Sequence, residues 1–427
     1  MASAASRRDE ILALASQVVA TSGLTLSVKD IADACGILPG SLYHHFDSKD
    51  AILRELVARY RDDLDQVAAR ATDRSVVAGA RPVLEEVMEL GTEIAACAMR
   101  HRAALLVTLY EPLRGAGAAP TGSDVVQPPA AIHEAVLGVL RAGQAREELR
   151  DGPDLSLLSE RICQSMFHHG VGHSSMTPGT RTMPGLRCRI LLQGIASAPP
   201  DVDSLDRSAP IAAARRAVST WEDDDGSDRS AHIVDVARTA FCRWGFRPTK
   251  MRDIAAAAGI GVGTLYRCYP AKGQLLTAVM ARYGTARRTG WEAVLAARSG
   301  TVVERLDALA YVHIELIARF GAEFRILLSL LRERPGVLRQ LGSTDAQRTQ
   351  LKQMLVAGER AGELQLGHGS ADLYSKCLYE LIGATESTVG AGVEAAHTFA
   401  RDTILAGAAV RTGPRIPGRV EAERLGP

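Results

Sequence analysis

Two segments of the chain repeat a set of small, hydroxyl-bearing and basic residues that suit contact with phosphate groups. In each segment a glycine precedes a hydroxyl residue, a tyrosine stands two residues later, and a lysine follows six residues after the tyrosine. Hydroxyl and ammonium groups donate hydrogen bonds to phosphate oxygens, and a glycine lets a phosphate approach the backbone. The pattern predicts contact with a nucleic-acid backbone. The candidate residues are Gly40, Ser41, Tyr43 and Lys49 in the first segment and Gly263, Thr264, Tyr266 and Lys272 in the second.

Two positions within these segments differ between the copies, and they are candidates for base recognition. Pro39 and His44 in the first segment correspond to Val262 and Arg267 in the second. Because a guanidinium can donate two hydrogen bonds to one guanine, Arg267 predicts a base preference that His44 does not share.

The two segments belong to a duplication of a whole unit. With Asp30 aligned to Asp253, the positions 30–60 show 14 identities over 31 residues without a gap. The similarity between the copies continues downstream, where Leu140–Leu149 matches Leu355–Leu364. Because a repeat at a fixed spacing reflects a repeated structural unit, we expect two units of roughly 200 residues each.

The elements that position these residues are predicted to be helices. In the first copy Ile11, Leu14, Ala15 and Val18 recur at the spacing of one helix face, and Gly23 stands where a helix-ending glycine belongs. A short helix, a tight turn at Gly36 and a second short helix follow. This order is a helix-turn-helix, whose second short helix can enter the DNA major groove.

The sequences "IADACGILPGSLYHHFDSKDAIL" and "IAAAAGIGVGTLYRCYPAKGQLL" resemble the signature of the tetracycline-repressor (TetR) family. The whole chain resembles the tandem, single-chain members known from actinobacteria, some of which repress lipid-uptake operons. The second copy departs from the signature at Cys268, Tyr269, Pro270 and Ala271, and Pro270 is expected to end its recognition helix abruptly.

The resemblance implies an all-α fold of two tandem units, each with a three-helix DNA-binding domain and a helical ligand and pairing lobe. The linker is assigned from its proline and its acidic run "WEDDDGSD", which favour a solvated chain, although a short helix near Ile211–Trp221 is compatible with it. The expected domains are 5–65, 66–197, a linker at 198–228, 229–288, 289–410 and a disordered tail at 411–427.

The same resemblance implies the partners. They are double-stranded operator DNA and a small apolar effector held inside a lobe. The two lobes are expected to pair through Asp154–Ser197 and Ser370–Ala408, so that one chain acts as an intramolecular pseudo-dimer on an asymmetric operator, alone or as a pair of chains. The candidates for the effector pocket are His101, Tyr110, Glu111, Arg114, Trp291, Phe320 and Arg325.

Charge separates the two DNA-binding segments. The window 229–288 holds eleven basic and two acidic side chains, a net charge of +9, whereas the window 1–60 holds six basic and seven acidic ones, a net charge of −1. Because neutralisation of phosphates drives non-specific affinity, the second copy is expected to supply most of the electrostatic attraction.

Other classes of function find little support. Cys163, His168, His169 and His173 lie close together in the sequence, and His169 and His173 have the spacing of a metal-ligand pair on a helix. No carboxylate or second cysteine nearby completes a ligand set. We therefore expect a cluster at a helix end that binds no metal, and no other cofactor. The chain shows no catalytic motif, no signal peptide and no apolar run of about 20 residues, so we expect a cytoplasmic non-enzyme. The alternative is a helical scaffold or ligand-binding protein in which one or both DNA motifs are inactive.

Overall fold

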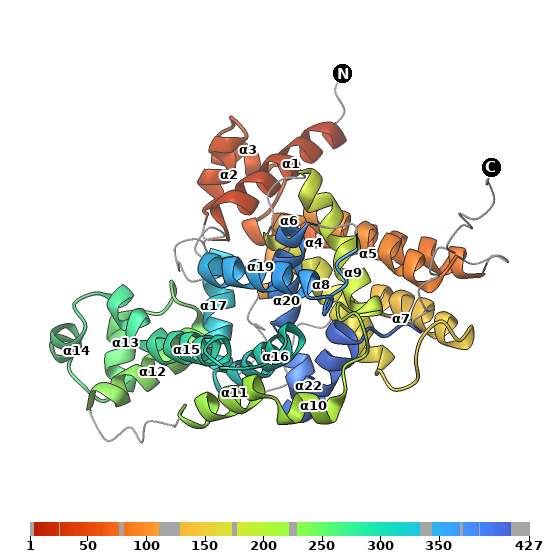
Figure 1. The fold of residues 1–427 in the computed structure, drawn as a ribbon. Coiled ribbons are helices and arrows are strands. Elements are labelled where there is room, and N and C mark those ends of the chain that lie inside the picture. The colour runs from red at the N-terminus through yellow and green to blue at the C-terminus, as the bar shows by residue number, and fades with distance from the viewer. Residues whose placement is uncertain are drawn as a thin grey trace, which may run out of the picture.

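The computed structural model describes residues 4–24, 26–76, 81–110, 129–172, 177–221, 229–333, 344–367, 370–383 and 385–410, and all regular elements in these ranges are helices (Figure 1). The first half holds α1 (Ala4–Ser22), α2 (Val28–Ala34), α3 (Pro39–Tyr43), α4 (Lys49–Val76), α5 (Val83–Arg100), α6 (Arg102–Tyr110), α7 (Ala130–Ala145), α8 (Leu155–Gly172) and α9 (Pro178–Gln193). Two helices follow between the halves, α10 (Val202–Arg207) and α11 (Ala209–Ser219). The second half holds α12 (Arg229–Trp244), α13 (Met251–Ala257), α14 (Val262–Cys268), α15 (Lys272–Leu295), α16 (Val302–Arg319), α17 (Gly321–Glu333), α19 (Thr344–Arg360), α20 (Ala371–Ile382), α21 (Glu386–Gly390), α22 (Val393–Ala400) and the π-helical turn η1 (Arg401–Leu405). The all-α expectation is therefore confirmed.

The helices repeat in the same order in both halves. In each half a helix, a short helix and a second short helix come first, followed by a long helix that carries a lysine at its first residue. These helix-turn-helix units, α1–α3 and α12–α14, stand at two separate corners of the helical body (Figure 1). The long helices α4 and α15 join each unit to its lobe.

Glycines with positive φ end the first helix and make the turn in both units. Gly23 and Gly245 have φ of 76° and 82°, and Gly36 and Gly259 have φ of 64° and 65°. A side chain at this backbone conformation is strained, so glycine is the residue that permits the turn. The start of α2 is further held by Ser27 and Asp30, which form a capping box.

The two units are packed differently. The core of the first unit is continuous with the large core of the helical body. The second unit has a separate core, in which Ile233, Phe241 and Leu265 pack with Ile326 and Leu330 of α17. The second unit is therefore joined to the body mainly through α15 and α17.

The segment 198–228 is more structured than predicted. Its residues 202–219 form α10 and α11, and α11 packs against α15 and α16. Ile211, Ala214 and Val218 are buried on one face of α11, and Trp221 is 8% exposed against Phe320. The short helix that the sequence allowed near Ile211–Trp221 is thus present as α11, and its apolar face is buried instead of solvated because it packs on α15 and α16. The acidic run itself and the predicted tail, 411–427, lie outside the described residues.

The two lobes contact each other through reciprocal backbone pairs. An antiparallel bridge joins Leu149 to Ala409, and its mirror joins Leu364 to Ala196. Leu149 and Leu364 are equivalent positions of the repeat, as are Ala196 and Ala409. When residue i meets j and j meets i, the contact is that of a two-fold axis. The two bridges are reciprocal in this sense and lie near the ends of α9 and η1.

Two glycines lie beside these bridges with their backbones in contact. A Cβ on Gly194 would lie 2.6 Å from the nitrogen of Gly407, and a Cβ on Gly407 would lie 2.4 Å from the nitrogen of Gly194. Both have positive φ, 68° and 85°. The close approach of these two chain segments therefore needs glycine at both positions.

One contact between the two lobes is not reciprocal. Arg187 of α9 is fully buried and forms an ion pair with Glu380 of α20. Arg161 of α8 donates to the carbonyl oxygens of Leu381 and Gly383, at 2.8 and 2.7 Å. Buried guanidinium groups need such partners. The first lobe supplies both arginines and the second lobe supplies their acceptors, so these contacts favour pairing of unlike lobes.

Candidate nucleic-acid interface

The second short helix of each unit presents most of its side chains to solvent. In α3 only Leu42 is buried, and in α14 only Leu265 is buried. Tyr43 and Tyr266 are 52% and 47% exposed, and Val262 is 42% exposed. Exposed tyrosine hydroxyls can donate to phosphates, and apolar side chains can touch base edges, when such a helix enters a groove.

The remaining predicted residues lie on the same faces. Gly40, Ser41 and His44 are exposed on α3 or at its end, and Pro39 is half-buried at its first turn. On α14 Gly263 and Arg267 are exposed and Thr264 is half-buried, with its hydroxyl 3.1 Å from Arg267 Nη2. The fold therefore brings the predicted contact residues of each unit together, apart from the two lysines.

The glycines of these faces are not required by packing. A Cβ on Gly40 or on Gly263 would meet nothing within 4 Å, and neither residue has a positive φ. A glycine that neither the turn nor the core requires leaves room for an external group to approach the backbone closely. Both units keep such a glycine at the same place.

The two lysines are engaged inside their units. Lys272 Nζ donates to the carbonyl oxygens of Phe246, Arg247 and Thr249, at 2.9, 3.1 and 3.0 Å. Lys49 Nζ donates to the carbonyl oxygens of Leu24 and Leu26, at 2.7 and 2.8 Å. An ammonium group has three donors, so Lys272 has none left for a phosphate in this geometry.

Both lysines therefore tie the start of the long helix to the loop between the first two helices. This structural role differs from the predicted phosphate contact, and the sequence held no sign of it because the acceptors are backbone carbonyls.

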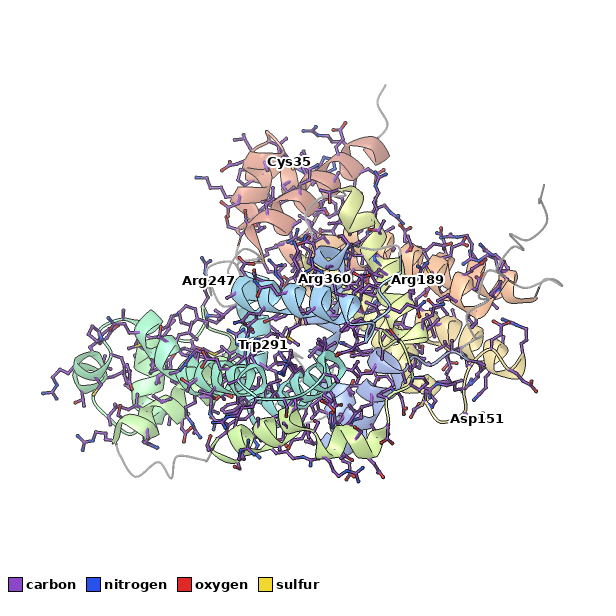
Figure 2. All side chains as sticks on the ribbon, viewed as in Figure 1. Cys35, Asp151, Arg189, Arg247, Trp291 and Arg360 are labelled. Atoms are coloured by element: carbon purple, nitrogen blue, oxygen red, sulfur yellow. The ribbon has the colours of Figure 1, made fainter. Side chains whose placement is uncertain are left out.

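Three of the six basic side chains in residues 1–60 form ion pairs with acidic ones: Arg7, Arg8 and Arg59. Arg8 forms an ion pair with Glu55 and stacks 4.1 Å from the ring of Phe46. Arg59 lies 2.6 Å from Asp9. In the second unit Arg243, Lys250 and Arg267 are exposed, and no carboxylate of the described residues lies within an ion-pair distance of them. Figure 2 shows Arg247 at the surface. The difference in net charge predicted from the sequence is thus carried by exposed groups of the second unit.

Helix α14 ends just before Pro270, as expected of a proline that cannot continue a helix. The helix ends at Cys268, and Tyr269 leaves the helical conformation with φ of −135°. The hydroxyl of Tyr269 is 2.9 Å from Ser230 Oγ at the start of α12. The departure from the family signature does not shorten this helix, because α14 runs two residues further than the equivalent α3, and it attaches the end of α14 to α12.

The candidates for the effector pocket are divided between the two lobes. Trp291 is 2% exposed, and its Nε1 donates to Gln350 Oε1 at 2.8 Å (Figure 2). Phe320 packs edge-on against Trp221, and His101 Nε2 lies 2.8 Å from Asp63 Oδ2. Arg325 is half-buried in α17. Glu111 and Arg114 and the side chain of Tyr110 lie outside the described residues.

The interior of the second lobe holds an aromatic group around Trp291. His313 and Tyr379 lie with their ring centroids 5.8 and 6.2 Å from that of Trp291. Burial lowers the pKa of His313 to about 4, although a hydrogen bond to the Leu309 carbonyl opposes the shift. This histidine is therefore neutral near pH 7.

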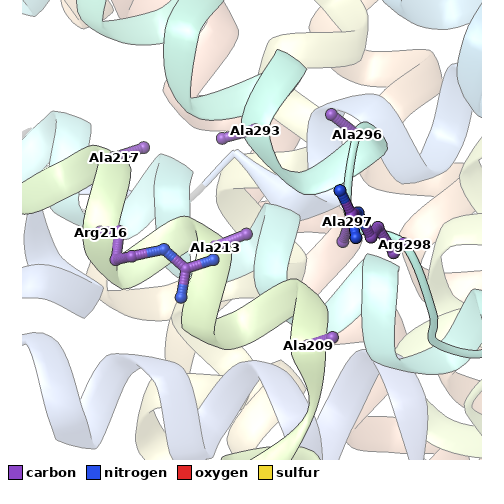
Figure 3. Close-up of a pocket in the computed structure, with 8 residues that line it drawn as sticks. All are labelled: Ala209, Ala213, Arg216, Ala217, Ala293, Ala296, Ala297 and Arg298. Atoms are coloured by element: carbon purple, nitrogen blue, oxygen red, sulfur yellow. The ribbon is translucent and has the colours of Figure 1, made fainter.

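A groove of about 570 Å³ lies elsewhere, between α11 and the end of α15. Six alanines line it together with Arg216 and Arg298 (Figure 3). None of the predicted effector residues is among them.

The predicted histidine cluster does not assemble into a ligand set within the described residues, and His173 lies outside them. A different group does assemble. Asp63, Cys97 and His101 bring one ligand atom each to within 4.8 Å of one another. The spacing of Cys97 and His101, four residues apart at the end of one helix, was the signal in the sequence that could have indicated this group.

The family model for "Bacterial regulatory proteins, tetR family" matches the chain twice, at residues 11–56 and 233–279. The HTH-type transcriptional repressor KstR2 of Rhodococcus jostii is 52% identical over 59 residues, which are 14% of this chain and 29% of that repressor. KstR2 of Mycolicibacterium smegmatis is 52% identical over 67 residues, 16% of this chain and 31% of the relative. The chain thus spans about a third of the length of these relatives.

A solved structure of the fatty acid degradation regulator FadR from Bacillus halodurans aligns with 40% of this chain and 94% of its own, at 18% identity and a TM-score of 0.28. That score is too low to support an argument about the lobes. Among the described residues, no helix is long and apolar enough to cross a membrane.

Proposed function

We propose that this tandem TetR-family chain is a transcriptional regulator whose two helix-turn-helix units bind the two half-sites of one asymmetric operator. The observation that carries the proposal is the repetition, in one chain, of a short exposed helix with an unobstructed glycine and an exposed tyrosine. A helix of this kind fits the major groove, and the hydroxyls beside it fit phosphates.

The pairing of the halves supports the pseudo-dimeric part of the proposal. Dimeric helix-turn-helix proteins place two recognition helices on successive turns of DNA. The reciprocal contacts at Gly194 and Gly407 hold the two halves as such dimers hold their subunits. One chain then supplies both recognition helices.

Repression and response to an effector are the finer parts of the proposal. The KstR2 relatives are named as transcriptional repressors, which favours repression here. An effector bound inside a lobe would act by favouring one spacing of the two recognition helices over another. The aromatic interior around Trp291 favours an effector with an apolar body.

A mobility-shift assay with the full chain and the DNA upstream of its own gene tests the proposal. The wild-type chain is expected to form a specific complex that survives excess competitor DNA. The double variant Tyr43→Ala/Tyr266→Ala should weaken that complex by at least about tenfold, because each lost contact is worth about 1 kcal/mol. The matched control is Arg298→Ala, which lies in the alanine-lined groove away from both recognition helices.

The second candidate function is a regulator in which only the second unit binds DNA. It is favoured by the ion pairs that occupy Arg8 and Arg59 in the first unit. The two candidates differ in the single variants. Tyr43→Ala alone would leave the affinity unchanged if the first unit were inactive, and would reduce it if both units bind.

A further inference from the structure

Three side chains of metal-ligand type converge where α4, α5 and α6 of the first lobe meet. Asp63 comes from α4, Cys97 from the last turn of α5, and His101 from the residue that ends α5. Their ligand atoms lie within 4.8 Å of one another, and Asp63 Oδ2 is 2.8 Å from His101 Nε2.

The group is closed on one side and open on the other. Cys97 is fully buried, whereas the side chains of His101 and Asp63 are 20% and 37% exposed. An ion could therefore enter past Asp63 and reach the thiol beneath it. Arg100 Nη2 lies 3.7 Å from Asp63 and, among the described residues, is the one arginine or lysine within an ion-pair distance of the carboxylate.

A fourth polar group lies beside the three ligands. Tyr60 is 2% exposed, and its ring centroid is 5.7 Å from that of His101. Its buried hydroxyl has no hydrogen-bond partner within the described part of the chain. A buried hydroxyl without a partner costs free energy, which a bound ion or its water ligand would recover.

The second lobe shows that the fold does not need polar residues at this place. Phe320 ends α16 as His101 ends α5, and its backbone N–H donates to Leu316 as that of His101 donates to Cys97. Ala286 stands in α15 where Asp63 stands in α4, three residues after the equivalent tyrosine. Ala286, Leu316 and Phe320 are all buried. The same junction is thus apolar in one lobe and carries three ligands in the other.

We propose that Asp63, Cys97 and His101 form a binding site for a divalent transition metal of the zinc class. Thiolate, imidazole and carboxylate are the three protein ligands that zinc prefers, and three of them leave a fourth position for water. Tetrahedral zinc holds such atoms about 3.3 to 3.6 Å apart, so the three groups need to move by only about 1 Å. The ion would replace the hydrogen bond between Asp63 and His101.

An ion at this position would affect the placement of the first helix-turn-helix unit and not that of the second. α6 packs against α4 and against α1 of the helix-turn-helix unit. An ion that joins α4 to the α5–α6 corner would therefore restrain the first unit relative to its lobe. The apolar junction of the second lobe offers no such restraint.

The test uses the purified full chain with Cys268→Ser, which removes the exposed thiol from α14. Titration with Co²⁺ is expected to give the near-ultraviolet absorption of a thiolate–cobalt bond at one ion per chain. Zn²⁺ should then displace the cobalt, abolish the absorption and raise the melting temperature. Absence of the thiolate–cobalt absorption in this otherwise unaltered chain would overturn the proposal.

The variants test the assignment of ligands. Cys97→Leu and His101→Phe install the residues that the second lobe uses, so they are expected to fold, and each should reduce zinc affinity by about 100-fold or more. Asp63→Ala, at the exposed rim, should reduce it while leaving the core untouched and serves if either core variant fails to fold. Retention of the cobalt spectrum in a folded Cys97→Leu chain would show that the ion binds elsewhere and overturn the site.

Discussion

Lys49 and Lys272 stand at the same position of the two units, and each binds the carbonyl oxygens of the loop that precedes the second helix. Lysine at the start of the long helix was predicted to touch phosphate. The structure instead assigns each lysine to the stability of its own unit, since a buried carbonyl without a donor is costly.

Lys272→Met is therefore expected to lower the free energy of unfolding by about 1–3 kcal/mol, because three carbonyl oxygens lose their donor. Chemical denaturation of the full chain measures this, with the exposed Lys250→Met as the control. If Lys272→Met weakened DNA binding without lowering stability, the lysine would be a phosphate contact after all.

His313 gives the second lobe a sensitivity to acid. Burial lowers its pKa to about 4, below the value of about 6.5 that it has in an unfolded chain. The unfolded chain then binds more protons between these pH values, so stability is present above about pH 6.5 and falls as the pH is lowered towards 4, by about 3 kcal/mol.

His313→Ile, which places at this position the residue that the first lobe has at Ile94, should remove that part of the acid sensitivity. Melting temperatures at pH 7 and pH 5 measure the difference, and the exposed His232→Gln is the control. An unchanged pH dependence in His313→Ile would mean that another group carries the effect.

At the scale of elements, the helix-turn-helix units were largely predictable from the sequence and their surroundings were not. The spacing of Ile11 and Leu14 indicates a helix face, and Gly36 indicates a turn. Both features depend on residues that are near in the sequence, so a sequence pattern can predict them. The contacts of Lys272, by contrast, depend on backbone carbonyls, which every residue has. The burial of α11 depends on the surfaces of α15 and α16, which the local sequence does not describe.

The pairing of α9 with η1 depends on the close approach of Gly194 and Gly407. An alanine at Gly194 would place its Cβ 2.3 Å from the carbonyl oxygen of Leu405, at a positive φ. Gly194→Ala should therefore cost about 2 kcal/mol or more and loosen the contact between the lobes.

Thermal unfolding and hydrogen exchange at residues 193–196 measure this effect. Gly138→Ala is the control, because a Cβ there meets nothing within 4 Å and its helical backbone accepts alanine. Equal stability of the two variants would contradict the close approach.

At the scale of the whole molecule, the charge lies on one of the two units. The salt dependence of DNA binding reports the number of phosphates neutralised, at about 0.9 per contact in the slope of log affinity against log salt. Arg247→Ala/Lys250→Ala in the second unit should flatten this slope by up to about 1.8, and Lys29→Ala/Arg54→Ala in the first should change it little. Equal changes in both double variants would show that the two units bind the backbone equivalently.

The central claim is that one chain occupies two half-sites through α3 and α14. Footprinting of the chain on its operator tests it most directly, with Gly40→Asp and Gly263→Asp as variants. A side chain at either glycine meets nothing in the fold, so both variants should fold as the wild type does, while the carboxylate repels the DNA backbone. We expect the wild-type footprint to cover two adjacent half-sites, Gly40→Asp to lose one of them and Gly263→Asp to lose the other. If either variant left the full footprint intact, or if both lost the same half-site, the claim would be contradicted.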